Sequence, residues 1–232
     1  QTARAIGNFQ ISGQYTNNYP DFMKAWGMIK LACARANTDV GEMTPAKLKM
    51  IEPACEELIK GNYLDQFKVD LYQGGAGTST NMNANEVLAN IALEKAGYKK
   101  GEYDKISPND DLNMAQSTND TYPTSLKLTM ILQNGKVINE LKLLAKSFRT
   151  LGNTYLGIVK MGRTELQDAV PMTVGQEFHS YASMLEWNIS NIETANEALK
   201  TLNMGGTAIG TGLNARKGYD IAVIKHLNKI TG

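Results

Sequence analysis

A regular apolar repeat between residues 178 and 202 constrains the fold of this chain more than any other feature. Its members recur at alternating spacings of three and four residues, and they are Phe178, Tyr181, Leu185, Asn188, Ile192, Ala195, Leu199 and Leu202. This spacing is typical of a helix that packs lengthwise against another helix. We therefore predict a helix of roughly thirty residues that begins near Pro171. Asn188 either fixes the register of this helix or faces solvent.

Helical periodicity also dominates the rest of the chain, whereas the alternation typical of strands is scarce. Further helices are expected over residues 20–37, 45–60, 86–97 and 122–151, and in a short stretch that ends at Gly232. The second of these has the clearest ends, with Thr44 as N-cap, Pro45 in the first turn and Gly61 as the stop. We therefore predict an all-α fold.

Two connecting regions have a more local interpretation. Residues 83–86 read as the N-terminal cap of the helix that ends near Gly97. Residues 99–112 are polar, contain Pro108, and read as an exposed loop.

The two long helices, over residues 122–151 and 171–202, cannot close a bundle by packing only on each other. Such a pair would leave apolar faces in contact with water. We therefore expect them to pack against further helices from sequence beyond these 232 residues or from other subunits. The prediction is an obligate oligomer, a fragment of a longer protein, or both.

Composition excludes several functional classes. With 24 Lys and Arg against 23 Asp and Glu, the chain has no basic stripe for nucleic acid. Its apolar runs are too short to span a bilayer. Cys33 and Cys55 lack metal-ligand spacing and are expected to be reduced thiols in a cytoplasmic protein. With only His179 and His226, the inventory supports neither a zinc site nor a Ser-His-Asp triad.

Three polar segments precede predicted helices, and they span Gly74–Asn85, Gln116–Asp120 and Lys160–Asp168. The first is expected to be a loop, because burying a polar group without a partner costs roughly 1–3 kcal/mol. Helix N-termini attract anions, so the three segments together could hold a small dicarboxylate. The donors they offer are Thr78, Thr80, Asn81, Ser117, Thr118, Asn119, Arg163 and Thr164. Taken singly, each segment also fits an ordinary helix cap or a solvated charge group.

Six motifs closely resemble the aspartase/fumarase superfamily, in the same order and over essentially the whole chain. They are Gly74–Glu86, Pro108–Asp110, Gln116–Asp120, Gly162–Pro171, Gly175–Phe178 and Gly206–Asn214. Within the superfamily the chain is more similar to the aspartase branch than to class II fumarases. Thr118 stands where fumarases typically have a second Ser, and residues 166–171 read Leu-Gln-Asp-Ala-Val-Pro as in aspartases.

The resemblance implies an ammonia-lyase that reversibly deaminates L-aspartate to fumarate by β-elimination, through an aci-carboxylate intermediate and without metal or cofactor. Dense, preorganised hydrogen-bond donors stabilise such an intermediate. The residues it implies as substrate-binding are Thr78, Ser117, Thr118, Asn119 and Thr164. It also implies a cytoplasmic homotetramer, with active sites built from three subunits and no nucleic-acid or membrane partner.

The resemblance also implies how the chain is divided. Residues 1–118 would form an N-terminal helical domain whose start is missing. Residues 119–232 would form the first part of a central up-down helix bundle. The remainder of that bundle, a C-terminal domain and the loop with the catalytic base serine would lie outside this sequence.

Two further positions depart from the family pattern. Glu165 stands where fumarases carry His and many aspartases carry Gln or His, so its role in catalysis stays open. A carboxylate there would repel substrate carboxylates unless it is protonated, paired or turned away. Ser107 replaces the His typical of a second anion site in fumarases, so we do not expect that site over Ser107–Asp110.

Three functions remain open from the sequence. The first is an aspartate ammonia-lyase activity of the complete protein, and the second is that of a class II fumarase or another lyase of the superfamily. The third is a truncated, non-catalytic protein that oligomerises through its long helices.

Overall fold

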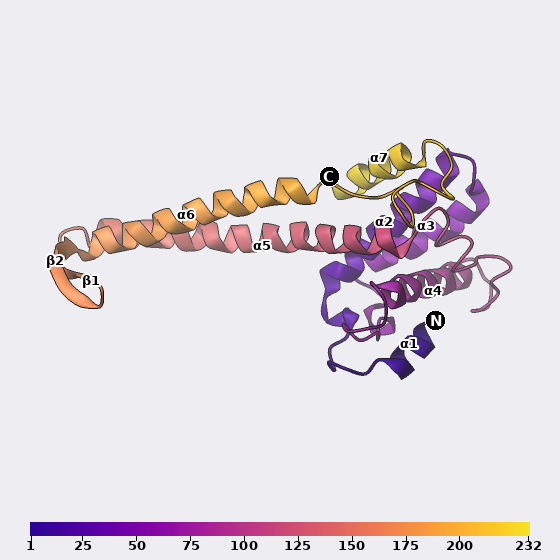
Figure 1. Ribbon diagram of the computed structural model, residues 1–232, viewed down its shortest axis with the longest axis horizontal. Coiled ribbons are helices and arrows are strands. Elements are labelled where there is room, and N and C mark those ends of the chain that lie inside the picture. Colours follow the sequence, from indigo (N-terminus) through magenta and orange to yellow (C-terminus); the bar gives the residue numbers. More distant parts are fainter. The chain divides into compact units, whose positions relative to one another are not determined.

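The computed structural model describes residues 1–232, and helices make up most of it (Figure 1). Its elements in order are α1 (Thr2–Asn8), η1 (Thr16–Asn18), α2 (Pro20–Asp39), α3 (Pro45–Ile59), η2 (Leu64–Gln66), α4 (Thr78–Lys95), α5 (Thr118–Thr154), β1 (Val159–Thr164), β2 (Gln167–Thr173), α6 (Val174–Leu199) and α7 (Tyr219–Thr231). The predicted helical class is confirmed, and the hairpin β1–β2 is an addition to it. No helix is both long and apolar enough to cross a lipid bilayer.

The chain divides into two compact units. The first unit joins Gln1–Thr129 to Leu202–Gly232, and the second is Met130–Thr201. The long helix α5 contributes its first turns to one and the remainder to the other. The predicted division after residue 118 concerns complete domains and stays a prediction.

Helix α2 is the centre of the first unit, because it is buried along most of its length. One face carries Trp26 and packs with Cys55 of α3 and Leu88 of α4 in a common core. The opposite face carries Cys33 and packs with Tyr219 of α7. Figure 1 shows α7 lying beside α2, so the last helix of the chain completes the core around the first long one.

The predicted ends of α3 are confirmed. Thr44 is its N-cap, and its hydroxyl oxygen accepts a hydrogen bond from the backbone nitrogen of Lys47 at 3.3 Å. Pro45 follows in the first turn, where its missing N–H would have no helical partner. Gly61 lies just beyond the end with a φ of 90°, a conformation that glycine adopts at little cost.

The predicted start of α4 at Glu86 is wrong, because this helix begins eight residues earlier, at Thr78. The glycine-rich segment is therefore a turn only as far as Gly77, which has a φ of 92°. A Cβ at Gly77 would overlap the ring of Tyr122 at the start of α5. Glycine is thus required both by the backbone conformation and by the close approach of the two helices.

The expectation that this polar segment cannot enter the core is also wrong. Asn81, Asn83 and Asn85 are at most 2% exposed, and each has found a partner for its amide nitrogen. Asn83 donates to the carbonyl of Gln66 at 3.2 Å, and Asn85 donates to the side chain of Asn113 at 3.2 Å. These hydrogen bonds of the amide nitrogens offset part of the cost of burial, whereas the side-chain oxygens of Asn83 and Asn85 are buried without a hydrogen-bond partner.

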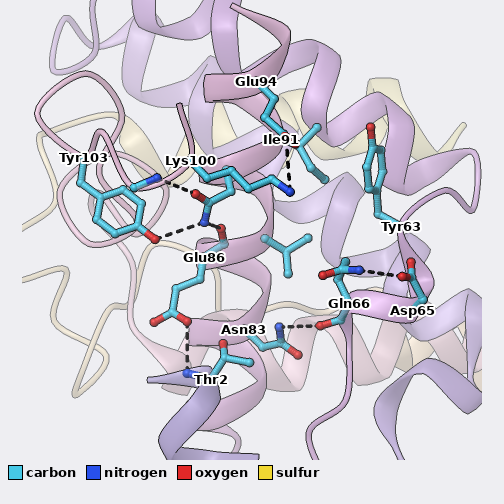
Figure 2. Close-up of a pocket in the computed structure, with 13 residues that line it drawn as sticks. Thr2, Tyr63, Asp65, Gln66, Asn83, Glu86, Ile91, Glu94, Lys100 and Tyr103 are labelled. Carbon is cyan, nitrogen blue, oxygen red and sulfur yellow. Dashed lines mark hydrogen bonds and ion pairs between the residues drawn. The ribbon is translucent and has the colours of Figure 1, made fainter. Parts of the chain in front are cut away.

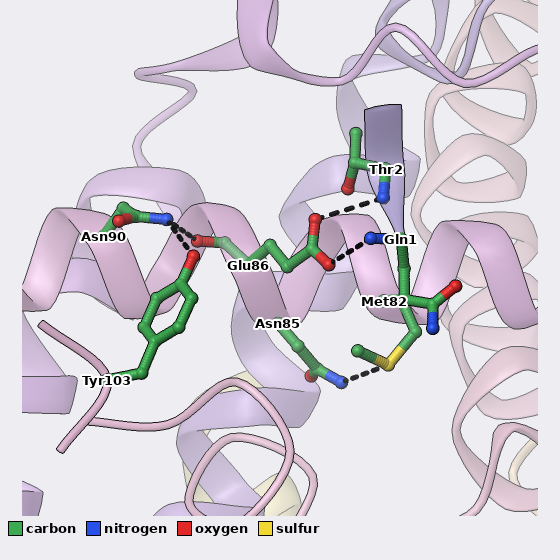
Figure 3. A network of polar contacts seen from close by, with 7 residues as sticks. All are labelled: Gln1, Thr2, Met82, Asn85, Glu86, Asn90 and Tyr103. Atoms are coloured by element: carbon green, nitrogen blue, oxygen red, sulfur yellow. Dashed lines mark hydrogen bonds and ion pairs between the residues drawn. The ribbon is translucent and has the colours of Figure 1, made fainter. Parts of the chain in front are cut away.

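Glu86 connects helices instead of capping one. Its carboxylate accepts hydrogen bonds from the backbone nitrogens of Gln1 at 2.8 Å and Thr2 at 3.1 Å (Figure 3). One turn further along α4, Asn90 donates to the hydroxyl of Tyr103 at 3.1 Å. The exposed side of α4 thus holds α1 and the loop after α4.

The loop over residues 99–112 is more buried than predicted at its C-terminal end. Ile106 and Leu112 belong to the core of the first unit. Asp111 is 3% exposed and accepts a hydrogen bond from Lys47 of α3 at 2.7 Å. An apolar residue on either side of the polar run therefore anchors this loop.

In the second unit, α6 runs antiparallel beside the C-terminal part of α5 (Figure 1). The predicted repeat of α6 is half correct, since Phe178, Leu185, Ile192 and Leu199 are partly buried. The members predicted between them are displaced by one residue: Ala182 and Ile189 are buried, while Tyr181 and Asn188 are exposed. Asn188 therefore faces solvent. The polar position of the interface is Asn196, which accepts a hydrogen bond from Asn134 at 2.7 Å.

Both long helices also begin elsewhere than predicted. α5 starts at Thr118, four residues before Tyr122. α6 starts at Val174 instead of near Pro171, which lies in strand β2. The actual start of α6 has a capping box, in which Thr173 and Gln176 exchange side-chain-to-backbone hydrogen bonds.

Candidate functional site

The predicted donors Ser117, Thr118 and Asn119 lie at the N-terminal end of α5. Asp120 organises this turn, because its carboxylate accepts from the backbone nitrogens of Ser117 at 2.9 Å and Thr207 at 3.1 Å. Burial raises the pKa of the Asp120 carboxyl, and these hydrogen bonds oppose that rise. The turn is thereby fixed to the glycine-rich segment before α7.

Asn119 is exposed, and both its side chain and its backbone engage the same glycine-rich segment. Its amide nitrogen donates to the carbonyl of Ala208 at 2.6 Å, and its backbone carbonyl accepts from Asn203 at 2.6 Å. The motif Gly206–Asn214 therefore supports the N-terminus of α5. The sequence did not indicate this role.

A buried amide connects this turn to α4. The Asn81 amide nitrogen donates to the Thr118 hydroxyl oxygen at 3.3 Å and to the Asn113 side-chain oxygen at 3.0 Å. The Asn81 oxygen accepts from Lys30 of α2 at 2.8 Å and from Thr121 at 3.4 Å. All the hydrogen-bonding positions of Asn81 are therefore occupied.

Lys30 is 1% exposed and lies beneath these donors. Its ammonium group also donates to the side chain of Gln116 at 2.7 Å and lies 5.5 Å from the centre of the Trp26 ring. Burial lowers the pKa of Lys30 from 10.5 to about 8, although Asp120 and two cysteines favour the charged form. Sequence reasoning missed Lys30. The available signal was one lysine inside an apolar helical stretch, between Trp26 and Cys33.

Thr78 occupies the first position of α4 and is exposed. It precedes Asn81 by three residues, so both side chains lie on one side of the helix. The fold of the first unit therefore brings two of the three predicted donor segments to connected helix N-termini.

The third segment forms the hairpin in the second unit. Thr164 pairs with Gln167, so that Glu165 and Leu166 form a two-residue turn at the tip of the hairpin. Both have positive φ values, 50° and 65°, as a type I′ turn requires. Thr164 and Glu165 are exposed, and Arg163 pairs with Asp168 at 3.4 Å. The sequence indicated only a polar segment before a helix here, and the hairpin was not predicted.

The segment Ser107–Asp110 uses its polar groups internally. The Ser107 hydroxyl donates to Asp110 at 2.9 Å, and the Ser107 backbone nitrogen donates to Asp111 at 2.8 Å. Both donors of Ser107 are therefore engaged by the carboxylates of this turn.

Two cavities flank α4. A cavity of about 750 Å³ opens beside its exposed face, and its lining includes Tyr63, Asn83 and Tyr103 (Figure 2). None of the predicted substrate-binding residues lines it. Thr78 lines a smaller cavity of about 190 Å³ together with Arg4 and Phe9.

The arrangement can bind and orient an anion through hydroxyls and amides. The carboxylate in this turn, Asp120, is buried and accepts hydrogen bonds from the backbone nitrogens of Ser117 and Thr207. Both histidines are engaged elsewhere, since His226 contacts Asp39 at 2.7 Å and His179 lies against Arg149 in the second unit. No group of three His, Cys, Asp or Glu side chains is placed to hold a metal ion. The assignment of individual substrate contacts stays a prediction.

The chain is similar to known proteins along its entire length. The sequence profile of a family described as Lyase matches residues 1–232. An aspartate ammonia-lyase from Pseudomonas aeruginosa is 49% identical over all of this chain and 49% of its own length. One from Escherichia coli is 45% identical over all of this chain and 48% of its own length. The chain thus spans about half the length of the curated relatives it matches.

Solved structures agree in fold. A fumarate lyase:delta crystallin from Brucella melitensis bound to cobalt has a TM-score of 0.97 at 44% identity, covering all of this chain and 50% of that one. A class II fumarase from Schistosoma mansoni has a TM-score of 0.91 at 34% identity, covering 99% of this chain and 48% of that one. The resemblance to the aspartase/fumarase superfamily is thereby confirmed: residues 1–232 belong to the lyase family.

Proposed function

We propose that the complete lyase containing residues 1–232 is an aspartate ammonia-lyase, which reversibly deaminates L-aspartate to fumarate. The observation that carries this proposal is the 49% identity to an aspartate ammonia-lyase along the entire chain. The donor-rich N-terminus of α5 is chemically consistent with it, because hydroxyls and amides can surround carboxylates closely.

In this proposal Thr78, Ser117, Thr118, Asn119 and Thr164 bind the substrate. Removal of the proton beside the β-carboxylate places a second negative charge on that group, and the amine then leaves. Preorganised donors stabilise this charge more than they stabilise the substrate, which lowers the barrier. The base would be a serine in a loop outside these 232 residues, so the described residues bind, orient and stabilise.

We also infer a homotetramer with sites shared between subunits. Supporting this, the second unit leaves large apolar side chains exposed on both helices, such as Leu143 at 60%, Met184 at 55% and Trp187 at 66%. Apolar exposure of this extent marks surfaces that associate. A cytoplasmic location, suggested by Cys33 and Cys55 as free thiols, is part of the same proposal.

A class II fumarase is the second candidate, favoured by the close structural match to the Schistosoma mansoni enzyme. The deciding experiment measures fumarate formation by absorbance with the complete protein, using L-aspartate and L-malate in parallel. Turnover with aspartate and not malate supports the proposal, whereas the reverse supports a fumarase. No turnover of either substrate would support the third reading, a non-catalytic oligomerising protein.

The role of Glu165 in the proposed reaction is decided by a separate experiment. It lies exposed at the tip of the hairpin, next to the predicted contact Thr164. Replacing Glu165 by Gln removes the charge and keeps the shape. An unchanged kcat and KM for aspartate would show that Glu165 takes no part in the reaction, while a lower KM would show that its charge repels the substrate.

A further inference from the structure

Lys30 is unusual because it is a buried cation that makes no ion pair. Its ammonium group donates to the side-chain oxygens of Asn81 at 2.8 Å and Gln116 at 2.7 Å, and to a backbone carbonyl at 3.4 Å. All of these acceptors are neutral. A neutral residue would avoid the cost of desolvating a charge at this position, so stability alone does not account for a lysine here.

What a lysine does provide is direction. An ammonium group can only donate hydrogen bonds, so Asn81 must turn its oxygen toward Lys30. The Asn81 amide nitrogen then faces the other way, where it donates to the Thr118 hydroxyl oxygen at 3.3 Å. If Lys30 were apolar, the hydrogen bond of 3.0 Å from the Asn81 amide nitrogen to the side-chain oxygen of Asn113 would be the main contact left to oppose reversal of the Asn81 amide.

The orientation of the Asn81 amide in turn determines the hydrogen-bond direction of the Thr118 hydroxyl. A hydroxyl oxygen that accepts a hydrogen bond keeps its own proton for another acceptor. If the Asn81 amide were reversed, the Thr118 proton would instead be directed at the Asn81 oxygen inside the protein.

We propose that Lys30 is a positioning residue, which acts through Asn81 to make the Thr118 hydroxyl a donor to a carboxylate of the substrate. This inference rests on the proposed function, because it takes Thr118 as a substrate contact. It adds a residue from α2 that touches no substrate and sets the hydrogen-bond direction of the site.

The sharpest variant is Asn81→Asp, because it replaces only the amide nitrogen and keeps the shape of the side chain. The introduced carboxylate would keep an acceptor toward Lys30 but would present a second acceptor to Thr118. The hydroxyl proton would then point into the protein. We expect kcat/KM with aspartate to fall by about a hundredfold, the size of a lost transition-state donor.

A double-mutant cycle with Thr118→Val separates positioning from general damage. If Asn81 acts through Thr118, the double variant should be no worse than Thr118→Val alone, within about threefold. Lys30→Met should show the same non-additivity. Lys47→Met is the matched control, since Lys47 also makes a 2.7 Å contact to a buried oxygen, that of Asp111. The fold-loss in kcat/KM caused by Lys47→Met should multiply with the fold-loss caused by Thr118→Val.

Activity of Asn81→Asp within about threefold of wild type would overturn the inference and leave the proposed function intact. If the losses in kcat/KM of Asn81→Asp and Thr118→Val multiplied in the double variant, the inference would likewise be overturned and the proposed function left intact. Both readings require that the wild-type protein converts aspartate, so an inactive wild type refutes the proposed function separately.

The inference can still be decided in that case by thermal unfolding of the complete protein. In the Asn81→Asp variant the new carboxylate forms an ion pair with Lys30, whereas in the Lys30→Met background the same carboxylate is a buried charge without a partner. The unfolding midpoint should therefore fall by about 5–10 °C more in the second background. An equal fall in both backgrounds would show that Lys30 does not orient the side chain at position 81, and would overturn the inference.

Discussion

The side-chain amide of Asn81 donates to the hydroxyl of Thr118 across 3.3 Å, and this contact joins the N-terminal part of α4 to the first turn of α5. The two residues lie 37 positions apart in the sequence and belong to two different motifs. The packing of the same two helices rests on Gly77, which immediately precedes α4 and gives the first prediction.

Gly77→Ala should destabilise the protein by about 2–5 kcal/mol. A left-handed backbone costs a non-glycine residue about 1–2 kcal/mol, and the added Cβ would also overlap the ring of Tyr122. Gly97→Ala is the control, because Gly97 has a similar φ of 84° with open space around it. Thermal or urea unfolding measures both, and equal losses would show that the contact with Tyr122 is unimportant.

Asn196→Ala should lower the free energy of unfolding by about 1–2 kcal/mol. It leaves the amide of Asn134, 2.7 Å away in the native state, without its partner inside the helix interface. Asn188→Ala should change it by less than about 0.5 kcal/mol, because Asn188 is exposed and bonds only to its own helix. A larger effect at Asn188 would restore the register first expected from the sequence.

Asp70→Asn should remove part of the acid sensitivity of the fold. Burial alone would raise the pKa of Asp70, but hydrogen bonds from Tyr72, Ser12 and Ile11 outweigh burial and lower it from 3.8 to about 2. The ionised group therefore stabilises the folded state above pH 3.8, and this contribution is lost as the pH falls toward 2.

The measurement for Asp70 is the unfolding midpoint as a function of pH. The wild type should lose stability more steeply than Asp70→Asn between pH 3.8 and about 2. Asp168→Asn, at a carboxylate that is 69% exposed, should keep the wild-type slope. Parallel curves for wild type and Asp70→Asn would contradict the prediction.

Neither Cys33 nor Cys55 should react with iodoacetamide in the native protein at about pH 8. Both are fully buried, and burial raises the pKa of Cys33 to about 12 and that of Cys55 further. Peptide mapping by mass spectrometry should find both alkylated only after unfolding in urea. Native-state labelling of Cys55 would show that α3 separates readily from α2, and labelling of Cys33 would show the same of α7 and α2.

Signals that act within a few residues were read correctly from the sequence. The cap at Thr44, the proline after it and the glycine beyond the helix fix the ends of α3 without help from the rest of the chain. The prediction was wrong for asparagines, which favour helix caps in isolation but can enter a helix when residues far away in the sequence supply hydrogen-bond partners. Asn81 and Asn85 were placed in a loop, although Lys30 and Asn113 allow them to enter a buried helix.

The hairpin was missed for a related reason. Its turn, Glu165-Leu166, has none of the glycine or asparagine that a type I′ turn usually carries. The repeat in α6 could not be fully predicted from the sequence, because Phe178 and Leu185 fit two alternative packing faces of the helix. Only the packed partner decides whether Tyr181 or Ala182 lies between them.

The asparagines of α4 also restrict how this helix could change by insertion. Asn81 and Asn85 both donate to Asn113, Asn81 also donates to Thr118, and Asn83 donates to Gln66. One added residue after Gly77 would rotate the later part of the helix by about 100° relative to its neighbours. All three amides would then lose their partners together. An apolar helix could repack after such a shift, but α4 has a single usable register, and its length before Asn81 is fixed.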